Sequence, residues 1–202
     1  MYQRYNLKMP KIKPPLVELD ELLAAEYDYI AQTANQANED RARVSSFYLI
    51  AVGSLVAALF GTQLFDVDKF TQAVKIMFSG LFVLLTLLGT STIMQLARLR
   101  SAWYESMLAM NQIKAFAMSQ NPELKQAFRW KAETLPAKYK QGSVSYYQAF
   151  EVALIGGLMF AAATFFLQEA FFAISIFNWI ISSVFGVLTI TTQLIIYKRA
   201  LK

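Results

Sequence analysis

The chain has 202 residues, of which 56% are hydrophobic, 16% are charged and 14% are aromatic. A soluble domain is about 45–50% apolar and about 25% charged, so this composition indicates a chain surrounded largely by lipid. The sequence contains no cysteine and no histidine. This excludes disulfides, zinc sites built from cysteine and histidine, and catalysis by a thiol or an imidazole.

The N-terminal part of the chain is charged before any apolar stretch begins, which is the wrong order for a secretory signal peptide. Residues 1–16 are basic and rich in proline, and we expect them to form a flexible arm. A helix is predicted from residue 17, because apolar residues recur at a spacing of three or four: Leu23, Tyr27, Ile30, Ala34 and Ala37. Arg41 interrupts this row and Val44 resumes it. No proline or glycine lies between residue 17 and the first predicted span at 44–65, so one helix should run from the cytoplasm into the membrane.

The second span is predicted at 74–97, where residues 76–97 are 22 consecutive uncharged positions. A helix of this length spans about 33 Å, against a hydrocarbon core of about 30 Å. No helix-breaking residue follows up to about residue 117. This helix should therefore also extend into the cytoplasm, with a candidate contact face formed by Leu99, Trp103, Met107, Met110 and either Ile113 or Lys114.

Residues 118–145 are predicted to be a cytoplasmic linker that contains an amphipathic helix at about 122–134, with Asn121 as its N-cap. A basic amphipathic helix with a tryptophan at the edge of its apolar side is typical of a segment that lies on anionic lipid. The same pattern suits a helix that covers the end of the bundle. The candidate residues for contact with lipid or a partner protein are Lys125, Phe128, Arg129, Trp130 and Lys131.

Residues 146–202 are predicted to hold the third span at 149–168, a short turn, the fourth span at 171–197 and a basic tail. The expected fold is therefore all-α: a polytopic membrane protein with four transmembrane helices, of which the first two extend into the cytoplasm as a helical bundle. A soluble helical core is the alternative, and four separate apolar stretches of membrane length argue against it.

The distribution of basic residues predicts the orientation. Seventeen of the 19 Lys and Arg residues lie before the first span, between the second and third, or after the fourth. The positive-inside rule places these segments, and both termini, on the cytoplasmic side of the cell (inner) membrane. Only two short turns, near 66–69 and 168–170, then remain outside. Because this topology accounts for the charge of the central loop, we expect no nucleic-acid binding.

Small residues that recur at a spacing of four allow helix backbones to approach closely inside a membrane. We expect helix packing, within the chain or between copies, through Gly53, Ala57, Gly61, Ala153, Gly157, Ala161, Ser182 and Gly186. The polar residues of interest within or near the spans are Glu151, Asn178, Gln193 and Gln95. Glu151 has two interpretations: a gate or contact residue paired with Arg43, Arg98 or Arg100, or an interfacial residue that reaches water.

The sequence has no charged residue near the middle of a span, no glycine-rich phosphate loop and no carboxylates at metal-ligand spacing. We therefore expect neither an enzyme nor a bound cofactor or metal. The expected function is that of a membrane scaffold or accessory subunit whose cytoplasmic helices bind partner proteins. The alternative is a homo-oligomeric pore or channel. Homo-oligomerisation is expected, because a four-span chain with several close-packing faces can contact more than one neighbour.

One feature of the layout resembles a known family. The polar segment from Ala25 to Arg43 leads directly into the first span at Val44–Gln63. In this respect residues 25–115 resemble the SLATT and Pycsar-effector type membrane modules of bacterial antiviral defence. The chain differs from them in its two further spans and in lacking a recognisable nucleotide-sensing domain. The resemblance implies assembly into a membrane-disrupting oligomer that another protein would trigger, and it transfers no catalytic residues.

Overall fold

The computed structural model describes residues 18–61 and 71–202, and within these residues it contains helices and no strand. Four helices are long: α1 (Leu19–Gly61), α2 (Gln72–Gln120), α4 (Val144–Phe171) and α5 (Ile176–Ala200). Each is long and apolar enough to cross a membrane. The prediction of an all-α chain with four such helices is confirmed. The predicted arm at 1–16 and the turn near 66–69 lie outside the described residues.

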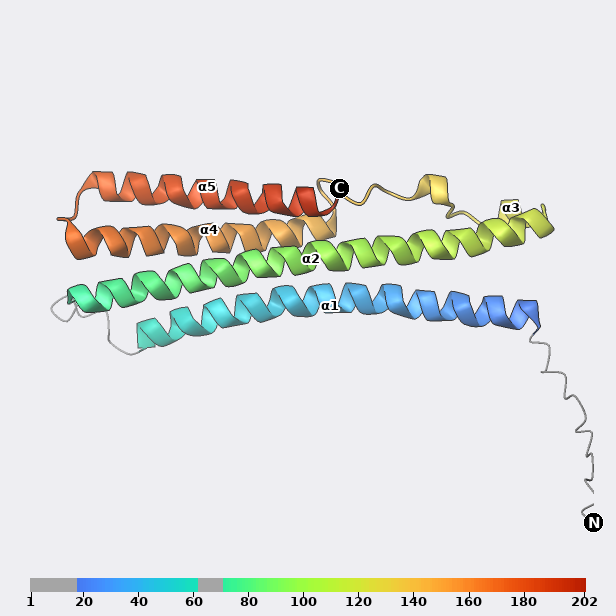
Figure 1. Ribbon diagram of the computed structural model, residues 1–202, viewed down its shortest axis with the longest axis horizontal. Coiled ribbons are helices and arrows are strands. Elements are labelled where there is room, and N and C mark those ends of the chain that lie inside the picture. The colour runs from blue at the N-terminus through green and yellow to red at the C-terminus, as the bar shows by residue number, and fades with distance from the viewer. Residues whose placement is uncertain (1–17, 62–70) are drawn as a thin grey trace, which may run out of the picture.

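The long helices lie side by side in the order α1, α2, α4, α5 (Figure 1), with α2 packed between α1 and α4 and with α5 packed mainly on α4. α1 and α2 have 43 and 49 residues, which gives lengths of about 65 and 74 Å. α4 and α5 have only 28 and 25 residues, or about 42 and 38 Å. α1 and α2 are unbroken and project beyond the four-helix part as a pair. We call this pair, residues 19–43 and 98–120, the stalk.

The stalk is held together by the apolar row of α1 that faces α2. Ile30, Ala34 and Ala37 are buried in this contact. The prediction that Arg41 interrupts this row was wrong. Arg41 occupies the next position of the row and is only 8% exposed. A residue four positions after Ala37 lies on the same face of the helix, so position along the helix rather than polarity decides its burial.

The four-helix part has an apolar core but, unlike a soluble protein, also exposes many large apolar side chains. α5 buries one stripe that consists of Asn178, Ser182, Gly186, Gln193 and Tyr197, and most of its large apolar side chains are exposed. Lipid solvates apolar side chains but offers no hydrogen bonds, so polar groups are more stable between helices. The exposed apolar surface therefore fits a bilayer and would be unfavourable in water.

The linker between α2 and α4 contains less helix than predicted. Only α3 (Leu124–Ala127) and the 3₁₀ turn η2 (Ala132–Thr134) are helical, so the continuous amphipathic helix expected at 122–134 was wrong. Phe128 has an extended backbone, with φ −91° and ψ 102°, and the chain after it follows α2 so that Trp130 reaches a pocket on that helix. A short isolated helix is only marginally stable. In place of the helix expected at 122–134, the linker forms side-chain contacts with α2.

Asn121 also has a different role from the expected N-cap. It is the C-cap of α2, and its backbone N–H donates to the carbonyl oxygen of Ala117. Its side-chain oxygen accepts a 3.1 Å hydrogen bond from the backbone N–H of Glu123. This local bond starts the turn at Pro122 without leading into a long helix.

The connection between the last two helices lies later in the chain than predicted. α4 continues through the expected turn at 168–170 and ends at Phe171, and α5 begins only at Ile176. The Gln168 amide donates to the Thr164 carbonyl oxygen at 3.1 Å and to the Ser182 hydroxyl at 3.0 Å. These bonds satisfy Gln168 as part of the helix, so the expected start of the fourth span at residue 171 is corrected to 176.

Candidate functional site

α4 and α5 approach each other closely where they cross at Gly157 and Gly186. A Cβ atom built on Gly157 would lie 2.3 Å from Ile190 Cγ1 and 2.7 Å from the Gly186 carbonyl oxygen. A Cβ on Gly186 would lie 3.0 Å from both the Gly157 carbonyl oxygen and Ala161 Cβ. The two backbones are therefore in direct contact. Ala153 and Ser182, the other small residues expected on these helices, are also buried.

The small-residue row of α1 is placed differently. Gly53, Ala57 and Gly61 are exposed, and no other atom comes within 4 Å of a Cβ built on Gly53 or Gly61. α1 packs on the bundle through a row of larger side chains, which includes Tyr48 and Val52. Among residues 18–61 and 71–202 the α1 row therefore has no close helix–helix contact at its glycines, and its expected role in packing between copies stays a prediction.

The close contact between α1 and α2 is instead at Gly89. A Cβ atom on Gly89 would lie 2.7 Å from the hydroxyl oxygen of Tyr48 and 2.9 Å from its Cζ. Tyr48 is 2% exposed, and its aromatic ring occupies the space that the missing side chain leaves. Gly89 is not part of a four-residue repeat of small residues, so the pattern that marked the other glycines could not find it.

A polar network joins α2, α4 and α5 inside the apolar region. The Gln193 side-chain amide is 2% exposed and donates to the Thr90 hydroxyl at 2.9 Å. The Thr86 hydroxyl donates to the Gly156 carbonyl oxygen at 3.3 Å. A Cβ on Gly156 would lie 2.7 Å from the Gln193 side-chain oxygen, so this glycine provides the room for the amide. The bond from Gln193 links α5 to α2 and the bond from Thr86 links α2 to α4, so the network favours one rotation of the three helices. The Gln193 side-chain oxygen is buried beside Gly156 and has no hydrogen-bond partner.

The remaining polar residues of interest are not brought together. Asn178 is buried, and its side-chain oxygen accepts a 2.8 Å hydrogen bond from the Ser175 hydroxyl. Gln95 and Glu151 are exposed. Within the described residues, Glu151 forms no ion pair, so the pairing with Arg43, Arg98 or Arg100 that the gate interpretation requires does not occur. Its position at the surface of α4 agrees with the interfacial interpretation.

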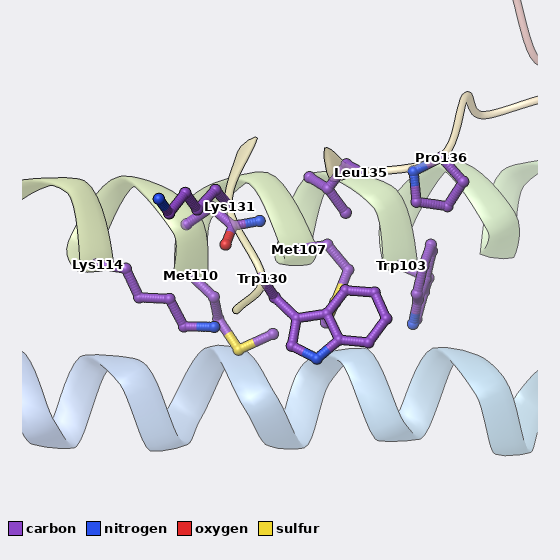
Figure 2. A pocket seen from close by; sticks show the side chains of 9 residues that line it. Trp103, Met107, Met110, Lys114, Trp130, Lys131, Leu135 and Pro136 are labelled. Carbon is purple, nitrogen blue, oxygen red and sulfur yellow. The ribbon is translucent and has the colours of Figure 1, made fainter. Parts of the chain in front are cut away.

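The stalk carries a pocket of about 440 Å³ between α2 and the linker. Figure 2 shows the indole ring of Trp130 beside Met107 and Met110 of α2. Asn111 also lines the pocket; it is 6% exposed, and its side-chain oxygen has no hydrogen-bond partner. The remaining lining residues are Trp103, Lys114, Lys131, Leu135 and Pro136.

The five residues expected to contact lipid or a partner are thus divided. Trp130 and Lys131 line the stalk pocket, whereas Phe128 lines a neighbouring pocket of about 490 Å³ with Tyr27 and other residues of α1 and α2. Lys125 and Arg129 are exposed and line neither pocket. Their expected contact with lipid or a partner protein therefore stays a prediction. The single shared helix face predicted for them is not formed, because Phe128 and Trp130 follow α3 in a part of the chain that is not helical.

No protein-family model, no curated protein sequence and no solved structure matches this chain. Residues 18–61 and 71–202 contain no group of three or more Asp, Glu, Cys or His side chains that could hold a metal ion. The observations define a class: an all-α chain with four helices long and apolar enough to cross a membrane, the first two of which form a projecting stalk.

Proposed function

We propose that the protein is a non-enzymatic membrane scaffold or accessory subunit whose stalk binds an amphipathic helix of a partner protein. The observation that carries this proposal is the pocket of about 440 Å³ on the stalk. Its methionines, Met107 and Met110, have flexible, polarisable side chains that adapt to a partner. Its tryptophans, Trp103 and Trp130, are the type of residue that contributes most to protein–protein binding energy. An apolar groove of this composition suits the apolar face of a helix.

The polar groups of the pocket specify the occupant further. The unpaired side-chain oxygen of Asn111 favours a hydrogen-bond donor next to the apolar anchor of the partner. Lys114 and Lys131 line the same pocket and favour acidic residues beside that anchor. The proposed partner segment is therefore an amphipathic helix with one large apolar side chain, flanked by acidic residues and by a polar donor.

The first test uses a photo-crosslinking amino acid placed at Met107 in the full chain and expressed in the source cells. Position 107 lines the pocket, and the exposed Gln112 of the same helix serves as the matched control. One discrete adduct with another protein is expected at position 107 and none at position 112. Adducts of the same pattern at both positions, or none at either, would contradict a specific docking site.

The proposal places the stalk in the cytoplasm, on the basis of the positive-inside rule. Because the chain has no cysteine, a single cysteine reports its own location. A membrane-impermeant maleimide applied to intact cells is expected to label Phe172→Cys, in the exposed turn before α5, and to leave Gln112→Cys in the stalk unlabelled. Labelling of the stalk cysteine from outside would reverse the topology.

A homo-oligomeric pore or channel is the second candidate function, and the outward row of Gly53, Ala57 and Gly61 favours it. Exposed small residues that have no close neighbour in the described part of the chain allow a second copy to approach closely. Native mass measurement after mild detergent extraction is expected to find more than one copy per particle, with Gly53→Leu reducing the copy number. Ion flux from reconstituted liposomes then separates the two functions, because a scaffold would give none.

A further inference from the structure

Two arginines are buried where the stalk meets the four-helix part. Arg41 of α1 is 8% exposed and lies three residues before the first predicted span, and Arg100 of α2 is 7% exposed and lies three residues after the second. α1 and α2 pack on each other, and the pKa of Arg41 is lowered first by burial and then by the positive charge of Arg100. Burial of two like charges side by side is unfavourable unless a negative charge joins them.

The hydrogen bonds of these arginines leave donors unused. Arg41 donates from Nη2 to the side-chain oxygen of Asn38 at 2.9 Å, while its Nε and Nη1 atoms are buried and have no partner. Arg100 donates from Nε to the carbonyl oxygen of Lys138 at 3.2 Å, and its guanidinium lies 4.2 Å from the centre of the Trp103 ring. These contacts orient both groups without neutralising either charge.

Within residues 18–61 and 71–202, no carboxylate pairs with Arg41 or Arg100. Two acids on the same helices are engaged elsewhere: Asp40 pairs with Arg43 at 3.2 Å, and Glu105 pairs with Lys138 at 3.5 Å. The hydroxyl of Tyr197 lies near both arginines. It bonds to the Ser145 hydroxyl at 2.6 Å and to the Ser145 carbonyl oxygen at 3.1 Å. The counter-charge is therefore missing from the described chain.

We propose that Arg41 and Arg100 together bind a phosphate group, either that of an anionic lipid headgroup or that of a soluble phosphate compound. Guanidinium groups match the oxygens of phosphate in geometry and form strong charge-assisted hydrogen bonds with them. Basic pockets between transmembrane helices, at the level of the lipid headgroups, bind anionic headgroups in this way. One phosphate would supply acceptors for Arg41 Nε and Nη1 and would balance both charges. Neither arginine lines the stalk pocket, although Trp103 borders both places, and the proposal does not depend on the scaffold function.

The test uses the full chain in dodecyl maltoside micelles, which contain no phosphate. The lipid arm adds phosphatidic acid and counts lipids retained per chain by native mass spectrometry, with phosphatidylcholine as the zwitterionic comparison. The wild type is expected to retain phosphatidic acid, and Arg41→Gln and Arg100→Gln to bind it at least about tenfold more weakly. Arg43→Gln and Arg98→Gln are the matched controls, because these exposed arginines lie two positions away on the same helices and should bind like the wild type.

The soluble arm titrates inorganic phosphate and follows Trp103 fluorescence in a Trp130→Phe, Trp179→Phe background, since Trp103 stacks on Arg100. A response that Arg41→Gln abolishes assigns a soluble phosphate, whereas binding only in the lipid arm assigns a headgroup. If a glutamine variant fails to fold, Arg41→Lys and Arg100→Lys keep the charge, lose the planar fork, and are also expected to weaken binding. No binding in either arm, or equal losses in the control variants, would overturn the proposal.

Discussion

Gly157→Leu is expected to separate α4 from α5 and to lower the free energy of unfolding by about 3 kcal/mol, the upper part of the range for overpacked sites. A Cβ atom alone would lie 2.3 Å from Ile190 Cγ1 and 2.7 Å from the backbone oxygen of Gly186. A backbone oxygen cannot rotate away as a side chain can, so the helices themselves must move. That movement would also strip contacts from Ser182 and Gln193, which lie on the same stripe of α5.

The measurement is the mole fraction of sodium dodecyl sulfate at which half of the detergent-purified protein is unfolded. Gly80→Leu is the matched control, because Gly80 is an exposed glycine and a Cβ atom placed on it would have no other atom within 4 Å. The control variant should unfold at the same point as the wild type. An equal loss in both variants would show that leucine harms any helix position, and no loss in Gly157→Leu would show that the crossing is looser than described.

Gly89→Leu is expected to displace α1 from α2 and to cost about 2 kcal/mol of stability. The added side chain would enter the space of Tyr48, whose hydroxyl and Cζ lie 2.7 and 2.9 Å from the Cβ position. Tyr48 is 2% exposed, so its ring has no free space to move into. Because α1 contacts the rest of the chain mainly through α2, the loss should appear as early protease cleavage of α1.

A second substitution tests the cause of this effect. Tyr48→Ala removes the ring that Gly89→Leu would strike, so the double variant should lose less stability than the sum of the two single variants. Gly80→Leu on the same helix again serves as the control and should leave the cleavage of α1 unchanged. Strictly additive losses for Gly89→Leu and Tyr48→Ala would contradict direct contact between the two positions.

The predictable part of the fold follows from the solvent. Uncharged stretches such as 76–97 must be helical in lipid, because only a helix satisfies the backbone polar groups within one segment. The continuation of the first two helices beyond Arg43 and Arg98 could also be predicted, because residues 17–43 and 98–117 contain no proline or glycine that would end a helix. The linker was mispredicted because Phe128 and Trp130 suit a helix face and an extended chain along α2 equally well, and the sequence does not contain the position of α2.

The amino-acid sequence alone therefore determined how many helices are long and apolar enough to cross a membrane and roughly where each begins and ends, since hydropathy and helix geometry are local properties. Only the tertiary structure decided which face of each helix is used. Gly157 packs against α5 whereas Gly53 is exposed, although both belong to similar repeats, and both Arg41 and Arg100 are buried. The physical reason is that small residues permit close packing in any direction, while the direction taken depends on side chains from other helices, such as Tyr48 against Gly89 and Gln193 against Gly156.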